Sequence, residues 1–251
     1  MHVLERPAPD PDRVLRYADG TTGVVDVYDP PGVARGLALL LHGGFWRAAY
    51  DRRHLRPLAA ALAGDGWQVA LPEYRRVGDD GGGWPGTMTD AAHIVRDVPA
   101  LVGACAPERV VVVGHSAGGH LALLAAVENA RLAGAVSLAG VLDLTSAHAA
   151  GLSRGAVADL FGTTNPTPHL LASADPLRAT LPACALALLH GDRDAEVPID
   201  YSRVYAMRAA RIDLRVIEDA DHYDLIDPLE AAYSQLLLVL NGMVEAAETE
   251  T

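Results

Sequence analysis

The sequence predicts an α/β protein in which helices cover both faces of a mostly parallel sheet of about eight strands. Short apolar runs alternate along the chain with segments whose apolar residues recur at helical spacing, and this alternation is typical of parallel sheets. The clearest example is residues 109–124, where four valines precede a glycine-rich turn and a helical repeat follows it. We expect residues 1–251 to form a single domain, which is long enough to bury a substantial core.

Eight runs are expected to be strands because each is short, apolar or alternating, and bounded by turn-forming residues. The first two flank Asp19-Gly20, so they form either a hairpin or two edge strands. The expected strands are residues 14–17, 24–28, 36–41, 67–71, 110–113, 132–138, 185–189 and 214–217. Helices are expected where apolar residues repeat at helical spacing between them, around residues 55–62, 84–102, directly after Ser116, and at 199–210 and 229–244.

Residues 144–182 interrupt this rhythm. Small and polar residues dominate there, with short helical pieces at residues 156–161 and 168–172. We interpret this segment as a small lid or cap insertion over the sheet, within the single domain. Such an insertion would set the size of the substrate.

Composition excludes several classes of protein. The net charge is −12 and no basic cluster offsets it, so we expect no binding to nucleic acid. All the basic residues are arginine, which excludes chemistry that needs a lysine, such as a Schiff base. The spacing of His, Asp, Glu and Cys resembles no metal site, so neither a metal nor another cofactor is expected.

The cysteines and the apolar runs indicate the cellular compartment in which the protein is expected. Cys105 and Cys184 lie in apolar surroundings and are expected to be two buried thiols in preference to one disulfide, which suits a reducing compartment. The first residues contain no apolar signal region, and no apolar run reaches the length of a membrane span. We therefore expect a cytoplasmic protein that does not bind membranes. A monomer and a homodimer are both compatible with the sequence.

The turn after the valine run has the pattern of a nucleophile elbow. Gly114-His115-Ser116-Ala117-Gly118 is a G-x-S-x-G motif with an apolar strand before it and a helix after it. Such a turn strains its central residue and presents Ser116 at its tip. Gly114 and Gly118 are required because side chains there would collide with the neighbouring strand and helix.

A serine hydroxyl becomes an effective nucleophile when a neutral imidazole removes its proton and a carboxylate holds that imidazole. Asp194 and His222 follow Ser116 in the order acid then histidine, which is the order of α/β-hydrolases, and each lies just after a strand. Loops at the carboxyl ends of parallel strands converge, so these residues are expected to meet. The competing candidates are Asp192 for the acid, which lies earlier in its loop, and His115 and His120 for the base.

The remaining histidines are expected to have structural roles. His42 and His190 end apolar strands and are expected to hydrogen-bond loop backbone. Surface or helical positions are expected for His54, His93, His148 and His169.

An oxyanion formed during attack on a carbonyl needs hydrogen-bond donors that are already in place. The backbone N–H of Ala117, at the start of a helix, is one candidate. The segment His42-Gly43-Gly44-Phe45 is another source, because a glycine-rich loop lets its amides turn toward a ligand.

Four motifs, H-G-G-F-W, G-H-S-A-G-G-H-L-A, H-G-D-R-D-A-E-V-P and D-H-Y-D-L-I-D-P, together resemble the α/β-hydrolase superfamily. More narrowly, they resemble its esterase/lipase branch, which contains the kynurenine formamidases. The resemblance spans nearly the whole chain and implies the α/β-hydrolase fold. It implies that Ser116 is the nucleophile, Asp194 the acid and His222 the base, with Gly44, Phe45 and Ala117 as oxyanion donors. Formamidases commonly carry Tyr where this chain has Phe45.

Several apolar side chains fall in loops expected near Ser116, and they predict an apolar pocket for an acyl or aryl group. They are Phe45, Trp46, Trp84, Leu142, Phe161 and Tyr223. We therefore predict a serine hydrolase that cleaves small carboxylic esters through an acyl-enzyme. The first alternative is an arylformamidase that hydrolyses N-formylkynurenine, and a more distant one is a non-catalytic ligand-binding protein of the same fold.

Overall fold

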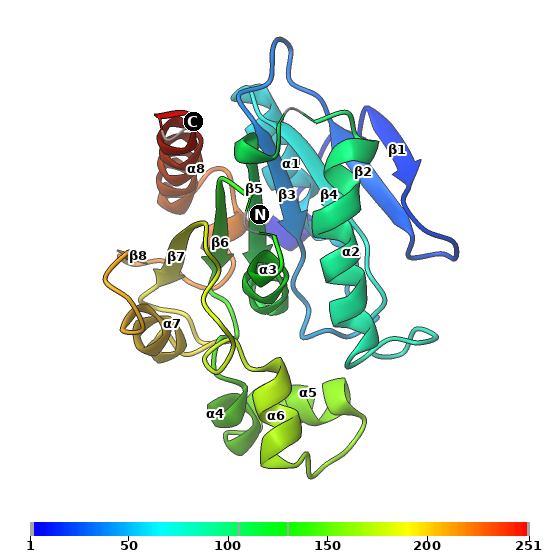
Figure 1. The fold of residues 1–251 in the computed structure, drawn as a ribbon, viewed down its shortest axis with the longest axis vertical. Helices are drawn as coiled ribbons and strands as arrows, with labels where there is room; N and C mark the ends of the chain where they lie inside the picture. Colours follow the sequence, from blue (N-terminus) through cyan, green and yellow to red (C-terminus); the bar gives the residue numbers. More distant parts are fainter. Residues whose placement is uncertain (1–2, 105, 130, 250–251) are drawn as a thin grey trace.

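In a computed structural model, which describes residues 3–104, 106–129 and 131–249, the strands of the described chain pair into one eight-stranded sheet (Figure 1). Its order is β1-β2-β4-β3-β5-β6-β7-β8. The first two pairings, β1 with β2 and β2 with β4, are antiparallel, and the pairings from β4 to β8 are parallel. The strands are β1 (Arg13–Arg16), β2 (Val24–Tyr28), β3 (Leu37–Leu41), β4 (Gln68–Pro72), β5 (Val110–His115), β6 (Gly134–Leu138), β7 (Ala185–Gly191) and β8 (Ile212–Ile217).

The central strands are apolar on both faces because each face is covered by helices. In β5, Val110 and Val112 face one core cluster, whereas Val111 and Val113 face the other. Neighbouring β3 behaves in the same way, and Leu41 at its end lies beside Gly114 in the parallel register. This double burial explains why the strands are continuous apolar runs.

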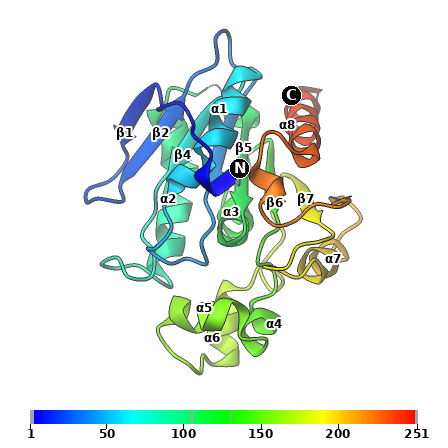
Figure 2. The ribbon, with the colours of Figure 1, turned by 180° about the vertical axis from the view of Figure 1, so that it is seen from behind.

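Helices α2, α3 and α7 pack on one face of the sheet, and α1 and α8 pack on the other (Figures 1 and 2). The α-helices are α1 (Arg56–Gly64), α2 (Gly86–Leu101), α3 (Ala117–Val127), α4 (Leu144–Ala149), α5 (Leu152–Phe161), α6 (Pro168–Ala174), α7 (Asp200–Ala206) and α8 (Ala231–Thr249). Short 3-10 turns are η1 (Val3–Glu5), η2 (Arg52–Leu55), η3 (Pro107–Arg109) and η4 (Asp224–Ile226).

Helices α4, α5 and α6 gather at one end of the molecule, below the sheet in Figures 1 and 2. They come from the segment interpreted as an insertion. Val157 and Leu160 of α5 belong to the same core cluster as α2 and α3, so this segment shares a core with the body of the protein. A lid function for residues 144–182 stays a prediction.

The predicted fold class is confirmed, and each of the eight strands begins and ends within two residues of its predicted bounds. The helix predicted for residues 199–210 is shorter than expected and ends at Ala206. Cys184 is a buried free thiol, whereas Cys105 lies outside the described residues. Among the described helices, none is both long and apolar enough to cross a membrane.

Candidate active site

The turn between β5 and α3 holds Ser116 in a strained conformation. Its φ and ψ are 55° and −118°, in a region that residues with a side chain rarely adopt. Backbone hydrogen bonds secure it: the Ser116 N–H donates to Leu138 O at 2.8 Å, and Ser116 O accepts from the Gly119 N–H at 2.9 Å, among others. Ser116 is 2% exposed and lines a cavity. The conformation is the one predicted from the G-x-S-x-G motif.

The two glycines of the motif are required for the reason inferred from the sequence. A Cβ atom at Gly114 would lie 2.0 Å from the carbonyl oxygen of Gly118. One at Gly118 would lie 2.0 Å from the carbonyl oxygen of Leu41, at the end of the neighbouring strand β3. Because backbone atoms form both obstacles, rotation of a side chain cannot relieve them.

Asp194 and His222 form a buried pair at the ends of β7 and β8. His222 Nδ1 donates to Asp194 Oδ2 at 2.7 Å, and the two side chains are 4% and 0% exposed. The other oxygen, Oδ1, accepts from the backbone N–H groups of Glu196 and Val197, both at 2.8 Å. The rival acid Asp192 is exposed, so the carboxylate that holds His222 is that of Asp194.

The environment of Asp194 favours its ionised form. Burial raises the pKa of this carboxyl, but hydrogen bonds from His190 and His222 outweigh that effect and lower the pKa below its usual range. His190 Nε2 lies 3.2 Å from Asp194 Oδ2, and it also donates to Val197 O at 3.0 Å, the backbone contact expected for this residue. Asp194 is therefore a permanent anion beside the His222 imidazole at neutral pH.

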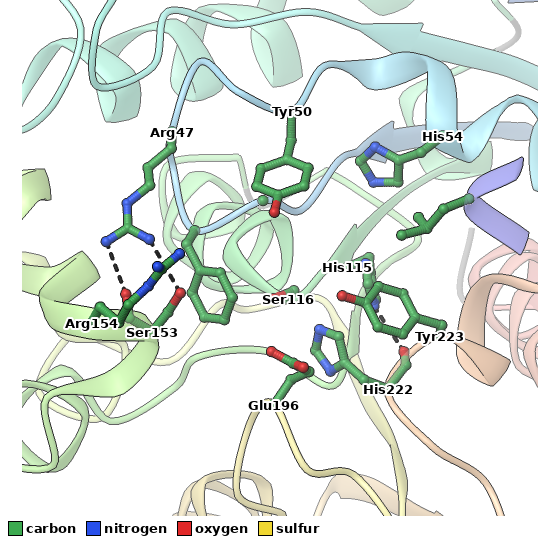
Figure 3. Close-up of a pocket in the computed structure, with 13 residues that line it drawn as sticks. Arg47, Tyr50, His54, His115, Ser116, Ser153, Arg154, Glu196, His222 and Tyr223 are labelled. Carbon is green, nitrogen blue, oxygen red and sulfur yellow. Dashed lines mark hydrogen bonds between the residues drawn. The ribbon is translucent and has the colours of Figure 1, made fainter. Parts of the chain in front are cut away.

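Because Nδ1 of His222 is bound to Asp194, its Nε2 is the nitrogen left for proton transfer. His222 and Ser116 line the same cavity (Figure 3). Within the described part of the chain, Ser116 Oγ is buried without a hydrogen-bond partner, so the contact between Ser116 and His222 is not formed in this state. Catalytic hydrogen bonds are often long before substrate binds, so this arrangement still allows the pair to act together.

The two alternative bases are engaged elsewhere. His120 Nε2 donates to Ala174 O at 2.8 Å, and its Nδ1 accepts from the indole N–H of Trp46 at 3.2 Å. His115 Nε2 donates to the backbone carbonyl of His222 at 3.0 Å. Burial lowers the pKa of His120 to about 4, and burial followed by the charge of His222 lowers the pKa of His115 well below 6.5. Both rings therefore stay neutral and support the structure around the site.

The loop after β3 turns back on itself beside Ser116. Gly44, Phe45 and Trp46 all have positive φ, at 111°, 51° and 59°, and the Arg47 N–H closes the turn on Gly44 O at 3.0 Å. A Cβ at Gly43 would lie 3.1 Å from Ser116 Cβ, which shows how closely the loop approaches the elbow. On the other side, the Ala117 N–H begins α3 and has no acceptor within the helix.

The buried side chains of His42 and Glu73 support the loop after β3. His42 Nε2 donates to Glu73 Oε1 at 2.6 Å, and the hydroxyl of Tyr74 donates to His42 O at 2.7 Å. Burial raises the pKa of Glu73, but the hydrogen bond and charge of His42 and the charge of Arg76 lower it to about 2. His42 was expected to bind backbone, and its Nδ1 does lie 2.8 Å from Gly43 O, but the Glu73 carboxylate is its second partner.

The cavity has a volume of about 380 Å3 and a mostly polar wall (Figure 3). Of the apolar side chains predicted to form the pocket, Phe45 and Tyr223 line it. The full lining is Leu4, Gly44, Phe45, Arg47, Tyr50, His54, His115, Ser116, Ser153, Arg154, Glu196, His222 and Tyr223.

Four residues predicted to bind substrate lie outside this wall. Trp46 is fully buried, and its indole N–H donates to His120 in the core instead of facing the cavity. Leu142 is also fully buried in the core. Trp84 and Phe161 pack against each other, with ring centroids 6.2 Å apart, and so join the loop before α2 to the end of α5. The cavity wall is therefore less apolar than predicted, because two of the six expected side chains, Phe45 and Tyr223, line it.

Several lining residues were not predicted. His54, expected at a surface or helical position, faces the cavity from η2, and its Nδ1 donates to Asp51 O at 2.6 Å. Burial, followed by the charge of His42, lowers the pKa of His54 to about 4. Ser153 and Arg154 come from α5, and Glu196 follows Asp194. No local pattern marks these positions, because their place depends on how distant loops meet.

The described residues contain no group of three or more His, Cys, Asp or Glu side chains arranged to hold a metal ion.

The strand order, the strained turn after β5 and the loops carrying Asp194 and His222 define a protein of the α/β-hydrolase fold. The chain belongs to the BD-FAE family, whose model matches residues 25–208. This match covers more than half of the chain and includes Ser116 and Asp194.

Two curated relatives match over most of this chain. One is a probable carboxylic ester hydrolase, LipM, of Mycobacterium tuberculosis, with 25% identity over 91% of this chain and 62% of its own length. The other is a probable isoprenylcysteine alpha-carbonyl methylesterase, ICME, of Oryza sativa, with 24% identity over 95% of this chain and 64% of its own length. The chain therefore spans less than two thirds of either relative.

Solved structures share the fold. An acetyl ester-xyloside bifunctional hydrolase from Caldicellulosiruptor lactoaceticus superposes with a TM-score of 0.77 at 18% identity, covering 94% of this chain and 97% of that chain. A thermophilic esterase, Est2, from Thermogutta terrifontis superposes with a TM-score of 0.70 at 22% identity, covering 93% and 92%.

Proposed function

We propose that the protein is a serine hydrolase that cleaves small carboxylic esters through an acyl-enzyme intermediate. One observation carries the proposal: Ser116, in its strained turn, shares a cavity with His222, which is hydrogen-bonded to the buried anion of Asp194. The relatives named as ester hydrolases add support, because they match over most of this chain.

In this mechanism, Ser116 Oγ attacks the ester carbonyl carbon while its proton moves to His222 Nε2. Asp194 stabilises the imidazolium that forms. The carbonyl oxygen becomes an oxyanion, which accepts hydrogen bonds from the Ala117 N–H and from those of Gly44 and Phe45. Collapse of this intermediate expels the alcohol, which takes the proton from His222. Water then attacks the acyl-enzyme by the same route and regenerates Ser116.

The size of the cavity favours small substrates. Its volume of about 380 Å3 lies near the lower end of the range of about 300–1,000 Å3 that is usual for ligand sites. Phe45 and Tyr223 supply aromatic surface for the substrate.

The test combines a covalent probe with turnover. A fluorophosphonate should label the protein at Ser116, and Ser116→Ala should lose both the label and about 10⁴- to 10⁶-fold in kcat on 4-nitrophenyl esters. Ser234→Ala, at an exposed position on α8, serves as the matched control and should retain both. Full activity in Ser116→Ala would contradict the proposal.

A substrate panel discriminates the two alternatives predicted from the sequence. Aryl esters, short alkyl esters, lactones and N-formylkynurenine should be compared with the same enzyme. A kcat/KM for N-formylkynurenine well above that for every ester would favour an arylformamidase. Tight ligand binding without turnover or labelling would favour a non-catalytic binding protein.

A further inference from the structure

The arginines of this chain are almost all paired. The sequence has 32 acidic and 20 basic residues, and nearly every guanidinium in the described chain contacts a carboxylate or a carbonyl. Arg154 and Arg178 are exceptions, because no hydrogen bond or ion pair joins either guanidinium to another described residue. Because arginines without a partner are rare in this acidic protein, we ask whether the position of Arg154 explains why its charge is left unpaired.

Arg154 lies in the wall of the cavity that contains Ser116. In Figure 3 its side chain extends from α5, on the side of Arg47 and Ser153, into the cavity. The guanidinium therefore reaches the space in which the substrate of the proposed hydrolase would bind.

The backbone that carries Arg154 is held in a defined, unfavourable shape. Ser153, Arg154 and Gly155 all have left-handed φ values, at 46°, 56° and 86°. For a serine and an arginine this conformation persists only when surrounding contacts enforce it, and it is frequent at functional sites. The enforced turn directs Arg154 toward the cavity.

Arg47 supplies those contacts from the glycine-rich loop beside Ser116. Its Nη2 donates to Ser153 O at 2.9 Å, and its Nη1 donates to Ser153 Oγ at 3.2 Å. Nη2 also donates to Asp159 Oδ2 at 2.6 Å. Arg47 thus forms its own ion pair with Asp159 and positions the turn that carries Arg154. The guanidinium of Arg154 is left free by the described residues to bind a ligand.

The charges around the cavity divide between its two sides. Glu196 lies two residues after Asp194 and lines the cavity, and in Figure 3 its side chain lies on the His222 side. Arg154 provides the positive charge on the α5 side. An anionic group of a bound substrate would be repelled by Glu196 and attracted by Arg154, which defines its orientation.

We propose that Arg154 binds an anionic group of the substrate, so that the enzyme prefers esters carrying a carboxylate remote from the scissile bond. This inference depends on the proposed function and names the substrate class for the same site. A guanidinium is suited to the task because its planar donors bind both oxygens of a carboxylate.

The test compares substrates that differ mainly in charge. Mono-4-nitrophenyl glutarate and 4-nitrophenyl valerate share a leaving group and a five-carbon acyl chain, but only the glutarate carries an acyl-side carboxylate. A second pair, 4-acetoxybenzoate and phenyl acetate, carries the carboxylate on the leaving group in the first member. The quantity to measure is the ratio of kcat/KM for the anionic member to that for the neutral member.

Arg154→Gln should lower this ratio by about 10- to 100-fold for at least one pair, mainly through KM, because a hydrogen bond to a charged group is lost. Arg154→Lys should restore part of the ratio, which a purely structural role would not explain. Arg178→Gln is the matched control, since Arg178 is also exposed but lies outside the cavity wall. This variant should leave kcat/KM unchanged for both members of each pair. Added salt should lower the wild-type ratio.

The possible failures are distinguishable. If the wild-type protein hydrolyses the neutral esters through Ser116 but the ratio is the same in Arg154→Gln for both pairs, the role of Arg154 is overturned and the proposed function stands. If neither member of either pair is hydrolysed and Ser116 is not labelled, the proposed function itself fails.

Discussion

The side chain of His115 donates a hydrogen bond from Nε2 to the backbone carbonyl of His222 at 3.0 Å, and the two rings lie 4.6 Å apart. The residue before Ser116 in the elbow therefore holds the loop that carries the proposed base. Burial and the charge of His222 lower the pKa of His115 well below its usual value, so the ring is a neutral donor. The proposed nucleophile, Ser116, and the proposed base, His222, are thus linked through the backbone of the elbow as well as through the cavity.

Replacing this donor should slow catalysis without abolishing it. His115→Phe keeps a ring in the buried site but leaves the His222 carbonyl without its partner, which should destabilise the fold by about 1–3 kcal/mol. We expect kcat to fall about 10- to 100-fold, because small displacements of a catalytic group have effects of this order. Steady-state kinetics and thermal unfolding measure the two effects. An unchanged kcat would show that His222 is held by its other contacts.

The acid is identified by comparing two aspartates of one loop. Asp194→Asn keeps the shape but removes the charge that stabilises the imidazolium, so kcat should fall by about 10⁴-fold. Asp192→Asn, at an exposed position two residues earlier, should remain within about twofold of the wild type. Equal losses in both variants, measured on the same ester, would count against the assignment of Asp194.

The elbow glycines should be intolerant of a methyl group. Gly118→Ala would place Cβ 2.0 Å from the Leu41 carbonyl, so we expect a loss of more than about 4 kcal/mol in the free energy of unfolding, or failure to fold. Gly242→Ala is the matched control, because its Cβ would meet nothing within 4 Å on α8, and it should stabilise by about 0.5–1 kcal/mol. Urea unfolding measures both changes.

Acid should destabilise the fold first through buried neutral histidines. The pKa of His120 is about 4 in the folded protein and 6.5 in the unfolded chain, so the unfolded chain binds more protons between these values. The free energy of unfolding should therefore decrease as the pH falls from about 6.5 to 4, by up to about 3 kcal/mol from His120. Urea titrations at several pH values test this, and His120→Gln should flatten the profile, whereas exposed His93→Gln should not.

Glu73 contributes a second loss at lower pH. Its pKa is about 2 in the folded protein and 4.5 without these surroundings, so it stabilises the fold above pH 4.5. That stabilisation is lost as the pH falls from 4.5 to 2. Glu73→Gln should reduce the slope of the profile in this lower window only, which separates it from the histidine effect.

Local patterns were sufficient to predict the fold class, the strands and the elbow. A strand buried on both faces must be a short apolar run, and the turn at Ser116 leaves room only for glycine at positions 114 and 118. These requirements act within a few residues along the chain, so the sequence records them directly. The order of Ser116, Asp194 and His222 was readable for a related reason, since each follows a strand of one parallel sheet.

The wall of the cavity required the tertiary structure. Phe45 and Trp46 are adjacent in the sequence, but the turn of left-handed residues directs Phe45 into the wall and Trp46 into the core against His120. Arg154 reaches the cavity because Arg47 holds the turn at Ser153. Arg47 lies 106 residues from Ser153 along the chain. Contacts between distant loops depend on how whole elements pack, and no periodicity of the sequence encodes them.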